Sequence, residues 1–454
     1  MAISTINRFI SLFDSAFHAL PAPVSMVDVE RLAMLVHHAM ASKTRAYHNS
    51  SHVFYMCEGM KPVQVLAALF HDVVYYQLDV GFPDRCAYLL DGVTRQEGDA
   101  LVLQPIPSDD EPLALCAALF DLAADQPLPL YGGMNEFLSA VVAARLLQPF
   151  LKTVDLIAVL ACIEATIAFR APHAHGPSAT DRLAQRVQRQ YRPRADETNT
   201  GAAQTYVDHV MTDAVALSNR DVGNFAEADP GLFLSTTWLL IEESNAPLKV
   251  AGVYTLQEYR YALTRMDSFL RSLNPAHVFQ QYKGQPDLQT MDELCAAAAR
   301  NITFSVDFLG AKITSIAIVE ALALCTGTDG PISMFLGEIR SAYGRPERVE
   351  DYLPEIPVSC DVNPDLLRLF DIGRTLESAN DLTASPITAF VYRSIGDKGT
   401  LMALAQARKM FNASLPPIAF LRSLNRDMVR AIVRACMHIS LSRRDALLAL
   451  DHSL

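Results

Sequence analysis

The amino-acid sequence predicts a mostly α-helical protein, with a helical core followed by a second all-helical region. Apolar residues recur at the helical period along almost the whole chain, no series of alternating strands is present, and loops are marked by clusters of Pro, Gly and acidic residues. Half of the 454 residues are hydrophobic and 19% are charged, which is typical of a compact globular protein. A break near residues 245–260 predicts two domains, 1–250 and 251–454.

The opening segment is predicted to be an amphipathic helix and not a signal peptide. Phe9, Phe13 and Phe17 recur at helical spacing, and Arg8 and Asp14 interrupt them on the other face. We therefore expect this segment to pack against the first domain.

Two strongly apolar stretches, 154–169 and 313–325, are predicted to be buried helices. Each is shorter than about 18 uninterrupted apolar residues, and Asp155, Glu164 and Glu320 lie in or beside them. Neither stretch is expected to span a membrane.

Charge and cysteine usage exclude some functional classes. Acidic residues outnumber Lys and Arg by 50 to 38, so strong nucleic-acid binding, which depends on cationic contacts to phosphates, is not expected. The eight cysteines are scattered without a CxxC pair, which argues against a disulfide framework or a zinc knuckle. These features indicate reduced thiols in a cytoplasmic protein.

The chemically informative stretch is 45–72. His48 and His52 are four residues apart, so on a helix both imidazoles would project from one face. His71 and Asp72 follow at the end of an apolar helical pattern. Neutral imidazoles and an ionised carboxylate suit zinc, manganese or iron, and a second helix can bring them opposite the first. The pattern therefore predicts a metal centre.

This pattern resembles the HD superfamily of metal-dependent phosphohydrolases, including the helical core of cyclic-nucleotide phosphodiesterases, and is most similar to a bacterial branch of predicted HD phosphohydrolases. The similarity covers about residues 30–245. The matching positions are Arg45, Tyr47, His48, His52, His71, Asp72, Tyr75, Asn135, Glu136, Ser139, Ala140, Ile163, Thr166 and the segment 213–217. The resemblance implies hydrolysis of a phosphate ester by a metal-activated water.

The resemblance also implies a ligand set. His52, His71 and Asp72 would be metal ligands, and Asp213 would close the set from a distant helix, with Asp221 as its competitor. The cofactor would be one or two divalent ions, with manganese, zinc, iron and magnesium all compatible.

Further roles follow from the same resemblance. His48 would donate a proton to the leaving group, and Glu136 would hydrogen-bond the water or a ligand. Arg45 would hold a substrate phosphate with two hydrogen bonds, and Tyr75 and Arg170 would also line the substrate site.

One position departs from the bacterial branch. Its members often carry a histidine three residues after the position of Thr166, where this chain has Phe169. His173 and His175 in the following loop are alternative ligands, and Arg170 is an alternative phosphate clamp. Whether the site takes one ion or two therefore stays open.

The leading functional hypothesis is hydrolysis of a nucleotide phosphomonoester or phosphodiester. A di-iron oxygenase is a second hypothesis, which the missing histidine at position 169 disfavours. A third is a non-catalytic nucleotide sensor that signals through residues 250–454. The expected partner is a small phosphorylated molecule, a homo-oligomer is compatible with the sequence, and no membrane association is expected.

Overall fold

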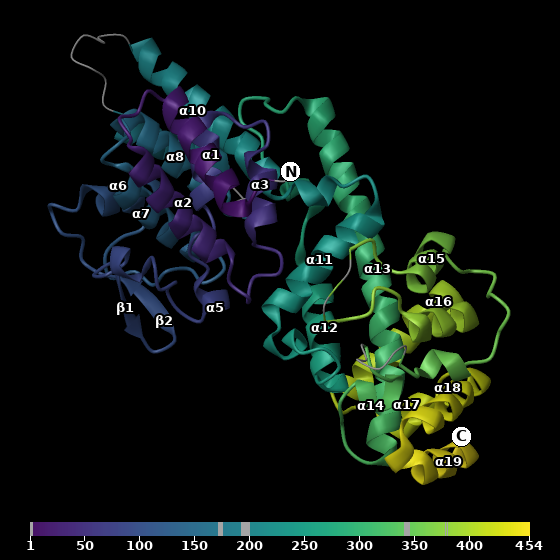
Figure 1. Cartoon of the computed structure of the whole chain (residues 1–454). Helices are drawn as coiled ribbons and strands as arrows, with labels where there is room; N and C mark the ends of the chain where they lie inside the picture. Colours follow the sequence, from purple (N-terminus) through teal and green to yellow (C-terminus); the bar gives the residue numbers. More distant parts are fainter. Residues whose placement is uncertain (1–2, 171–175, 192–199, 340–345, 377, 379) are drawn as a thin grey trace. The chain divides into compact units, whose positions relative to one another are not determined.

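The fold of the computed structural model is mostly α-helical, as the sequence predicts (Figure 1). The structure describes residues 3–170, 176–191, 200–339, 346–376, 378 and 380–454. The chain forms two compact units. Unit 1 comprises Met1–Ala226 and Asn274–Ala296, and unit 2 comprises Glu227–Leu273 and Ala297–Leu454.

This division differs from the boundary at residue 250 that the sequence suggests. Residues 227–250 belong to unit 2, and 274–296 return to unit 1. The returning segment is held there by hydrogen bonds: Gln280 N–H donates to Asn219 Oδ1 at 2.7 Å, and Tyr282 Oη donates to Asp208 Oδ1 at 2.9 Å. Such long-range polar pairs leave no periodic pattern in the sequence.

Unit 1 is built from ten α-helices, three short 3₁₀ turns and one hairpin within the described residues. They are α1 (Thr5–Ala19), α2 (Met26–Met40), α3 (Ser50–Cys57), α4 (Pro62–Phe70), α5 (Tyr76–Asp79), η1 (Ala87–Leu89), β1 (Thr94–Glu97), β2 (Ala100–Leu103), α6 (Glu111–Phe120), α7 (Met134–Leu147), α8 (Thr153–Ala165), α9 (Ala179–Gln190), α10 (Thr200–Asp221), η2 (Gly223–Ala226) and, in the returning segment, η4 (Pro275–His277).

Helix α8 is the central element of unit 1. Every residue from Leu156 to Ala165 is buried, and α4, α6, α7, α9 and α10 all pack against this helix. A helix that is apolar on all sides is stable only when neighbours surround it. The predicted buried helix at 154–169 therefore forms the middle of the core.

The amphipathic opening helix forms as predicted. Helix α1 buries Phe9, Phe13 and Phe17, and packs against α2 and α4. The sequence did not indicate the hairpin of β1 and β2, whose antiparallel register pairs Thr94 with Leu103. Each strand has only four residues, too few for a clear alternating pattern.

The described part of unit 2 contains nine further α-helices and three 3₁₀ turns, and the first residues of its longest helix belong to unit 1. They are α11 (Pro230–Ser244), η3 (Ala246–Lys249), α12 (Leu256–Ser272), α13 (Leu288–Thr326), α14 (Ser333–Leu336), η5 (Val349–Tyr352), α15 (Pro364–Ile372), α16 (Pro386–Phe411), α17 (Pro417–Arg422), α18 (Arg426–Ile439), η6 (Leu441–Arg443) and α19 (Arg444–Ser453).

Among the described helices, α13 alone is long and apolar enough to cross a membrane by length and composition. However, 89% of its most apolar window is buried inside the protein. Its apolar side chains, such as Ile316, Val319 and Leu322, are part of the core. The predicted burial of 313–325 is confirmed.

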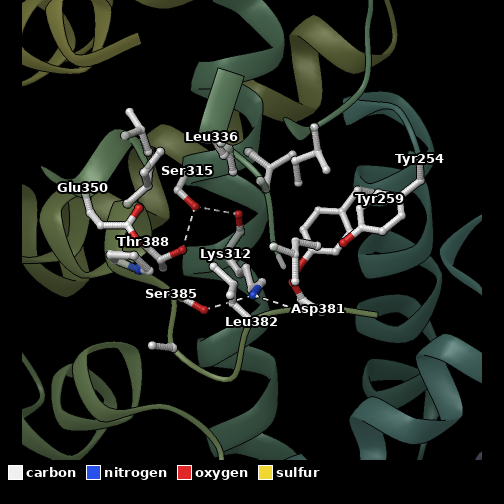
Figure 2. Close-up of a pocket in the computed structure, with 18 residues that line it drawn as sticks. Tyr254, Tyr259, Lys312, Ser315, Leu336, Glu350, Asp381, Leu382, Ser385 and Thr388 are labelled. Carbon is white, nitrogen blue, oxygen red and sulfur yellow. Dashed lines mark hydrogen bonds and ion pairs between the residues drawn. The ribbon is translucent and has the colours of Figure 1, made fainter. Parts of the chain in front are cut away.

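Unit 2 also contains a pocket of roughly 570 Å³, part of which is open to solvent (Figure 2). Residues of α12, α13, η5 and the first turn of α16 line its walls. The polar side chains in these walls include Tyr259, Lys312, Asp381 and Ser385.

Candidate metal centre

Two helix ends bring the expected metal ligands together. His71 directly follows α4, and Asp72 is the next residue. His52 lies in the first turn of α3, which packs against α4. His71 is 1% exposed and Asp72 is 8% exposed. The described residues therefore contain a buried His52–His71–Asp72 cluster, whose ligand atoms all lie within 4.8 Å of one another.

His48 does not share a helix with His52, contrary to the expectation from their spacing. Helix α3 begins at Ser50, because the Asn49 side chain accepts hydrogen bonds from the N–H groups of Ser51 and His52. Asparagine is a strong helix N-cap, so the residue before it is left outside the helix. The two imidazole rings still lie close, with centroids 5.9 Å apart.

The orientation of the His71 ring suits metal binding. Its Nδ1 lies 2.8 Å from the carbonyl oxygen of Ala68. A carbonyl can only accept a hydrogen bond, so Nδ1 carries a proton and Nε2 is the ring nitrogen left to bind a metal. This second contact is the usual way in which proteins orient a metal-ligating imidazole.

The free imidazole nitrogens face two carboxylates. His71 Nε2 lies 3.0 Å from Asp72 Oδ2, and His52 Nε2 lies 3.1 Å from Asp221 Oδ1. The crossed distances are 3.7 Å for His71 to Asp221 and 4.0 Å for His52 to Asp72. Both Nε2 atoms are buried, and in the described part of the chain neither makes a hydrogen bond of acceptable geometry.

These separations fit a single ion. Ligand atoms bound at about 2.1 Å from a first-row metal are separated by roughly 3–4 Å in tetrahedral and octahedral arrangements. Two imidazole nitrogens and two carboxylate oxygens are also a donor set that such metals prefer. The residues present therefore fit a divalent transition metal.

The expectation that Asp213 closes the ligand set requires correction. Asp213 Oδ1 accepts a hydrogen bond from Lys61 Nζ at 2.6 Å, and Asp221 takes the place beside the imidazoles. Both acids lie on α10, separated by eight residues, or about 12 Å along a helix. The position of each acid along α10 therefore favours Asp221 over Asp213 as the fourth ligand. His209, on the same helix, is exposed.

The cluster strongly perturbs its own titration. Burial lowers the pKa of His71, but the carboxylates of Asp72 and Asp221 outweigh burial and raise that pKa to about 9. Burial raises the pKa of Asp72, but the imidazoles of His71, His48 and His52 hold it well below its usual range. The carboxylate of Asp72 is therefore ionised at neutral pH.

Glu136 lies within electrostatic range of the same cluster. Burial raises the pKa of its carboxyl to about 7, and the negative charges of Asp72 and Asp221 act in the same direction. Glu136 is in the first turn of α7, whose N-cap residue is Gly133. A carboxyl that titrates near neutral pH can both accept and donate a proton.

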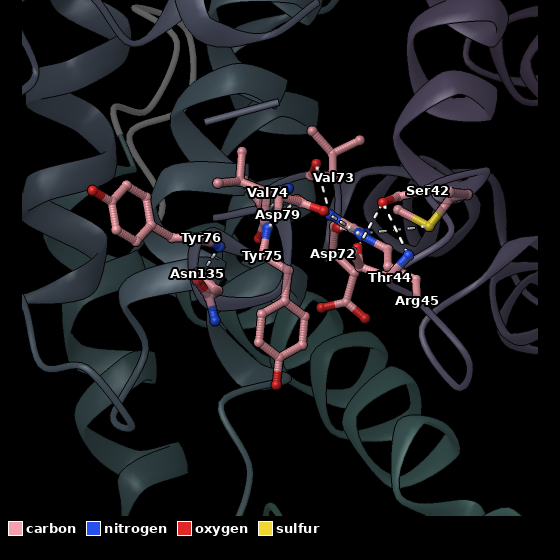
Figure 3. Close-up of polar contacts among 12 residues, drawn as sticks. Ser42, Thr44, Arg45, Asp72, Val73, Val74, Tyr75, Tyr76, Asp79 and Asn135 are labelled. Atoms are coloured by element: carbon pink, nitrogen blue, oxygen red, sulfur yellow. Dashed lines mark hydrogen bonds and ion pairs between the residues drawn. The ribbon is translucent and has the colours of Figure 1, made fainter. Parts of the chain in front are cut away.

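Arg45 does not face a substrate, contrary to expectation. Its side chain is 0% exposed and donates to the carbonyl oxygen of Asp72 at 2.6 Å and to both carboxylate oxygens of Asp79 (Figure 3). The guanidinium thus fixes the main chain at Asp72. The sequence analysis missed Asp79, although an acid close behind the His–Asp pair was a usable signal.

Two further residues that match the HD pattern, Asn135 and Ser139, also bind the main chain beside Asp72. Asn135 Oδ1 accepts from the N–H of Tyr76 at 3.0 Å, and Ser139 Oγ accepts from the N–H of Val74 at 3.0 Å. Together with Arg45, these α7 side chains hold the segment that follows Asp72. Figure 3 shows Arg45 and Asn135 beside this segment.

Of the remaining residues predicted to bind substrate, Tyr75 lies beside the cluster and Arg170 does not. The ring of Tyr75 lies 4.8 Å from the ring of His48, so it borders the cluster. Arg170 is paired with the buried carboxylate of Glu164 at 2.7 Å and does not point to a free phosphate site. The same carboxylate also binds Arg186. Thr166 closes α8 with a hydrogen bond to Ile163 O.

At the position of the missing histidine, Phe169 packs its ring against Phe225, with centroids 5.4 Å apart. The alternative ligands His173 and His175 lie outside the described residues. All eight cysteines are free.

Comparison of the chain with protein-family models, with curated proteins and with solved structures gives no match.

Proposed function

We propose that unit 1 is a metal-dependent hydrolase of phosphate esters of the HD type, acting on a nucleotide or a related small phosphorylated molecule. The observation that carries this proposal is the convergence of two buried imidazole Nε2 atoms on two carboxylate oxygens, at 3.0–4.0 Å. His52, His71, Asp72 and Asp221 would hold the ion. A divalent ion there would lower the pKa of a water towards neutrality and neutralise charge on phosphoryl oxygens.

The surrounding residues can manage the protons of such a reaction. His48 borders the cluster and is placed to donate a proton to a leaving oxygen, which is typically worth about 10²–10⁴-fold in rate. Glu136, whose pKa is about 7, is suited to accept a proton from the attacking water. Arg45 acts as a positioning residue, because it contacts the main chain of Asp72 and no open space.

The first test is metal content. Elemental analysis of the purified chain should find a near-stoichiometric transition metal, which a His71→Ala, Asp72→Ala double variant should lose. The matched control is Asp213→Asn, which removes an acid outside the cluster and should keep the metal.

The second test is turnover with the metal that is found. The loaded chain should hydrolyse p-nitrophenyl phosphate, bis(p-nitrophenyl) phosphate or a nucleoside monophosphate, and His48→Ala should slow it. Retained metal with no hydrolysis of any ester would favour the nucleotide sensor. Two irons per chain would favour the oxygenase, and no metal after reconstitution would refute the proposal.

A further inference from the structure

The pocket of unit 2 contains a buried lysine. Lys312 projects from α13, and its side chain is 6% exposed (Figure 2). Nζ donates a hydrogen bond to Ser385 Oγ at 2.9 Å, and lies 3.4 Å from Asp381 Oδ2. The amine therefore has a close hydroxyl partner and a longer ion pair with one carboxylate.

The counter-ion is shared. Asp381 Oδ2 also accepts a hydrogen bond from Tyr259 Oη at 2.9 Å, and Arg374 Nη2 lies 3.5 Å from it. Two cations thus compete for one carboxylate. Burial lowers the pKa of Lys312 to about 8, although Asp381 opposes the shift. The neutral amine, which is the nucleophilic form, is accessible near physiological pH.

The first turn of α16 adds a further feature. Ser385 is the N-cap residue, but its side chain makes no capping hydrogen bond, and its hydroxyl accepts from Lys312 instead. The first N–H groups of a helix have no partner within the helix. Ile387 and Thr388, in this turn, line the pocket. N–H groups at such a position stabilise a developing negative charge on oxygen.

The chemistry of the walls limits the ligand. An anion is disfavoured, because Asp381 is itself in the pocket wall and would repel it. Most of the remaining wall is aliphatic, formed by Ile316, Ile332, Leu336, Ile339, Leu382 and Ile387. The pocket therefore suits an uncharged molecule with an apolar body.

We propose that this pocket binds an aldehyde or ketone with an apolar body and joins its carbonyl carbon to Lys312 Nζ as an imine. The Nζ lone pair adds to the carbonyl carbon, and the carbonyl oxygen takes up a proton to give a carbinolamine. That proton comes from the amine. The carbon–oxygen bond then breaks, and the oxygen takes the second amine proton and leaves as water. No oxidant or reductant is needed. The Ser385 hydroxyl, 2.9 Å from Nζ, is placed to relay the proton.

The test is reductive trapping on the full chain. The protein is incubated at pH 7 with benzaldehyde and cyanoborohydride, which converts an imine into a stable benzylamine, and peptide mass mapping locates the adduct. At this pH the neutral fraction of an amine with a pKa of about 8 exceeds that of an ordinary lysine by more than about 100-fold. Lys312 should therefore be labelled at least tenfold faster than the exposed Lys409.

Two variants serve as controls. Lys312→Met should abolish the fast adduct, and Lys409→Met, in the same unit, should leave it unchanged. Ser385→Ala, which keeps the lysine, should slow labelling severalfold. Because the comparison of Lys312 with Lys409 is made on the wild-type chain, it does not depend on the folding of a variant. Labelling of Lys312 no faster than Lys409, or no labelling of Lys312, would overturn the proposal. Neither result depends on the metal centre of unit 1.

Discussion

At the scale of single residues, the candidate metal centre depends on which of two acids on α10 lies beside the imidazoles. Asp213 pairs with Lys61, and Asp221 faces His52 and His71. Both are carboxylates on one helix, so their chemistry is identical and only their place differs. The site can therefore be tested with two equivalent substitutions.

We predict that Asp221→Asn weakens metal binding at least tenfold and that Asp213→Asn does not. An amide carries no charge and is a poorer ligand, and loss of even an indirect contact in metal sites costs about 10–100-fold in affinity. Competition with a chromophoric chelator measures the two affinities. Equal loss in both variants would mean that the effect is one of net charge and not of ligation.

Arg45 is predicted to be critical for stability. Arg45→Met leaves Asp79, whose side chain is 8% exposed, without its cationic partner, and removing one member of a buried pair costs about 3–5 kcal/mol. Urea unfolding checks this value. The control is Arg31→Met, because Arg31 is 74% exposed and its pair with Asp28 should contribute less than about 1 kcal/mol. Similar losses in the two variants would contradict the structural role of Arg45.

Lys312 makes stability dependent on pH with a defined sign. Its folded pKa of about 8 lies below the ordinary 10.5, so between these values the unfolded chain holds a proton that the folded chain has lost. The contribution of Lys312 to stability therefore rises with pH across this window, by up to about 3 kcal/mol. The unfolding free energies of the wild type and of Lys312→Met should be measured at pH 7.5 and at pH 10. Relative to the variant, the wild type should be more stable at pH 10 than at pH 7.5. A difference independent of pH would contradict a lowered pKa.

At the scale of elements, the start of α7 shows how close packing supports the site. Gly133 has a φ of 113°, and a Cβ there would meet Ile167 Cδ1 at 2.5 Å. This glycine lets the first turn of α7, with Asn135 and Glu136, approach the end of α8. Gly133 is thus needed both for its backbone conformation and for its lack of a side chain.

Gly133→Ala is predicted to destabilise the protein by about 2–4 kcal/mol, through backbone strain and overpacking together. Ile167→Val, which removes the Cδ1 atom, should recover part of the loss in the double variant. Thermal unfolding of the four proteins of this cycle measures the coupling. Gly98→Ala is a useful comparison, since Gly98 also has a positive φ but has nothing within 4 Å of its added Cβ. Additive effects at positions 133 and 167 would exclude the clash.

The elements were more predictable than their ends and partners. The periodic apolar pattern located α1, α4 and α8, and the helix that ends at His71 was visible in the sequence. The start of α3 was misjudged, because spacing alone favoured a helix through His48 whereas the Asn49 cap excludes it.

The partners within the site depend on tertiary contacts. Sequence patterns cannot tell that Arg45 binds Asp79 rather than a phosphate, or that Arg170 binds Glu164. Each of these pairs joins side chains whose charges are equally compatible with a ligand. Only the three-dimensional arrangement distinguishes a buried ion pair from a binding group.

At the scale of the whole molecule, the two units carry two chemically distinct sites. The candidate metal centre lies in unit 1, and the Lys312 pocket lies in unit 2. Anything that binds only the folded form of one unit should stabilise that unit first.

We predict that calorimetry resolves two unfolding transitions. Manganese or zinc at about 100 times its dissociation constant should stabilise the unit 1 transition by about 2.7 kcal/mol. Lys312→Met should shift the other transition only. A metal that moves both transitions equally would show that the units unfold as one.

The return of residues 274–296 to unit 1 has a practical consequence for dissecting the protein. A fragment that stops at Ala226 would remove the partners of Asn219 and Asp208, both on the helix that carries Asp221. Unit 2 is likewise assembled from two separate stretches of chain. Neither unit can therefore be obtained by a single truncation. In evolutionary terms, the two parts cannot be exchanged between proteins by one simple fusion of genes.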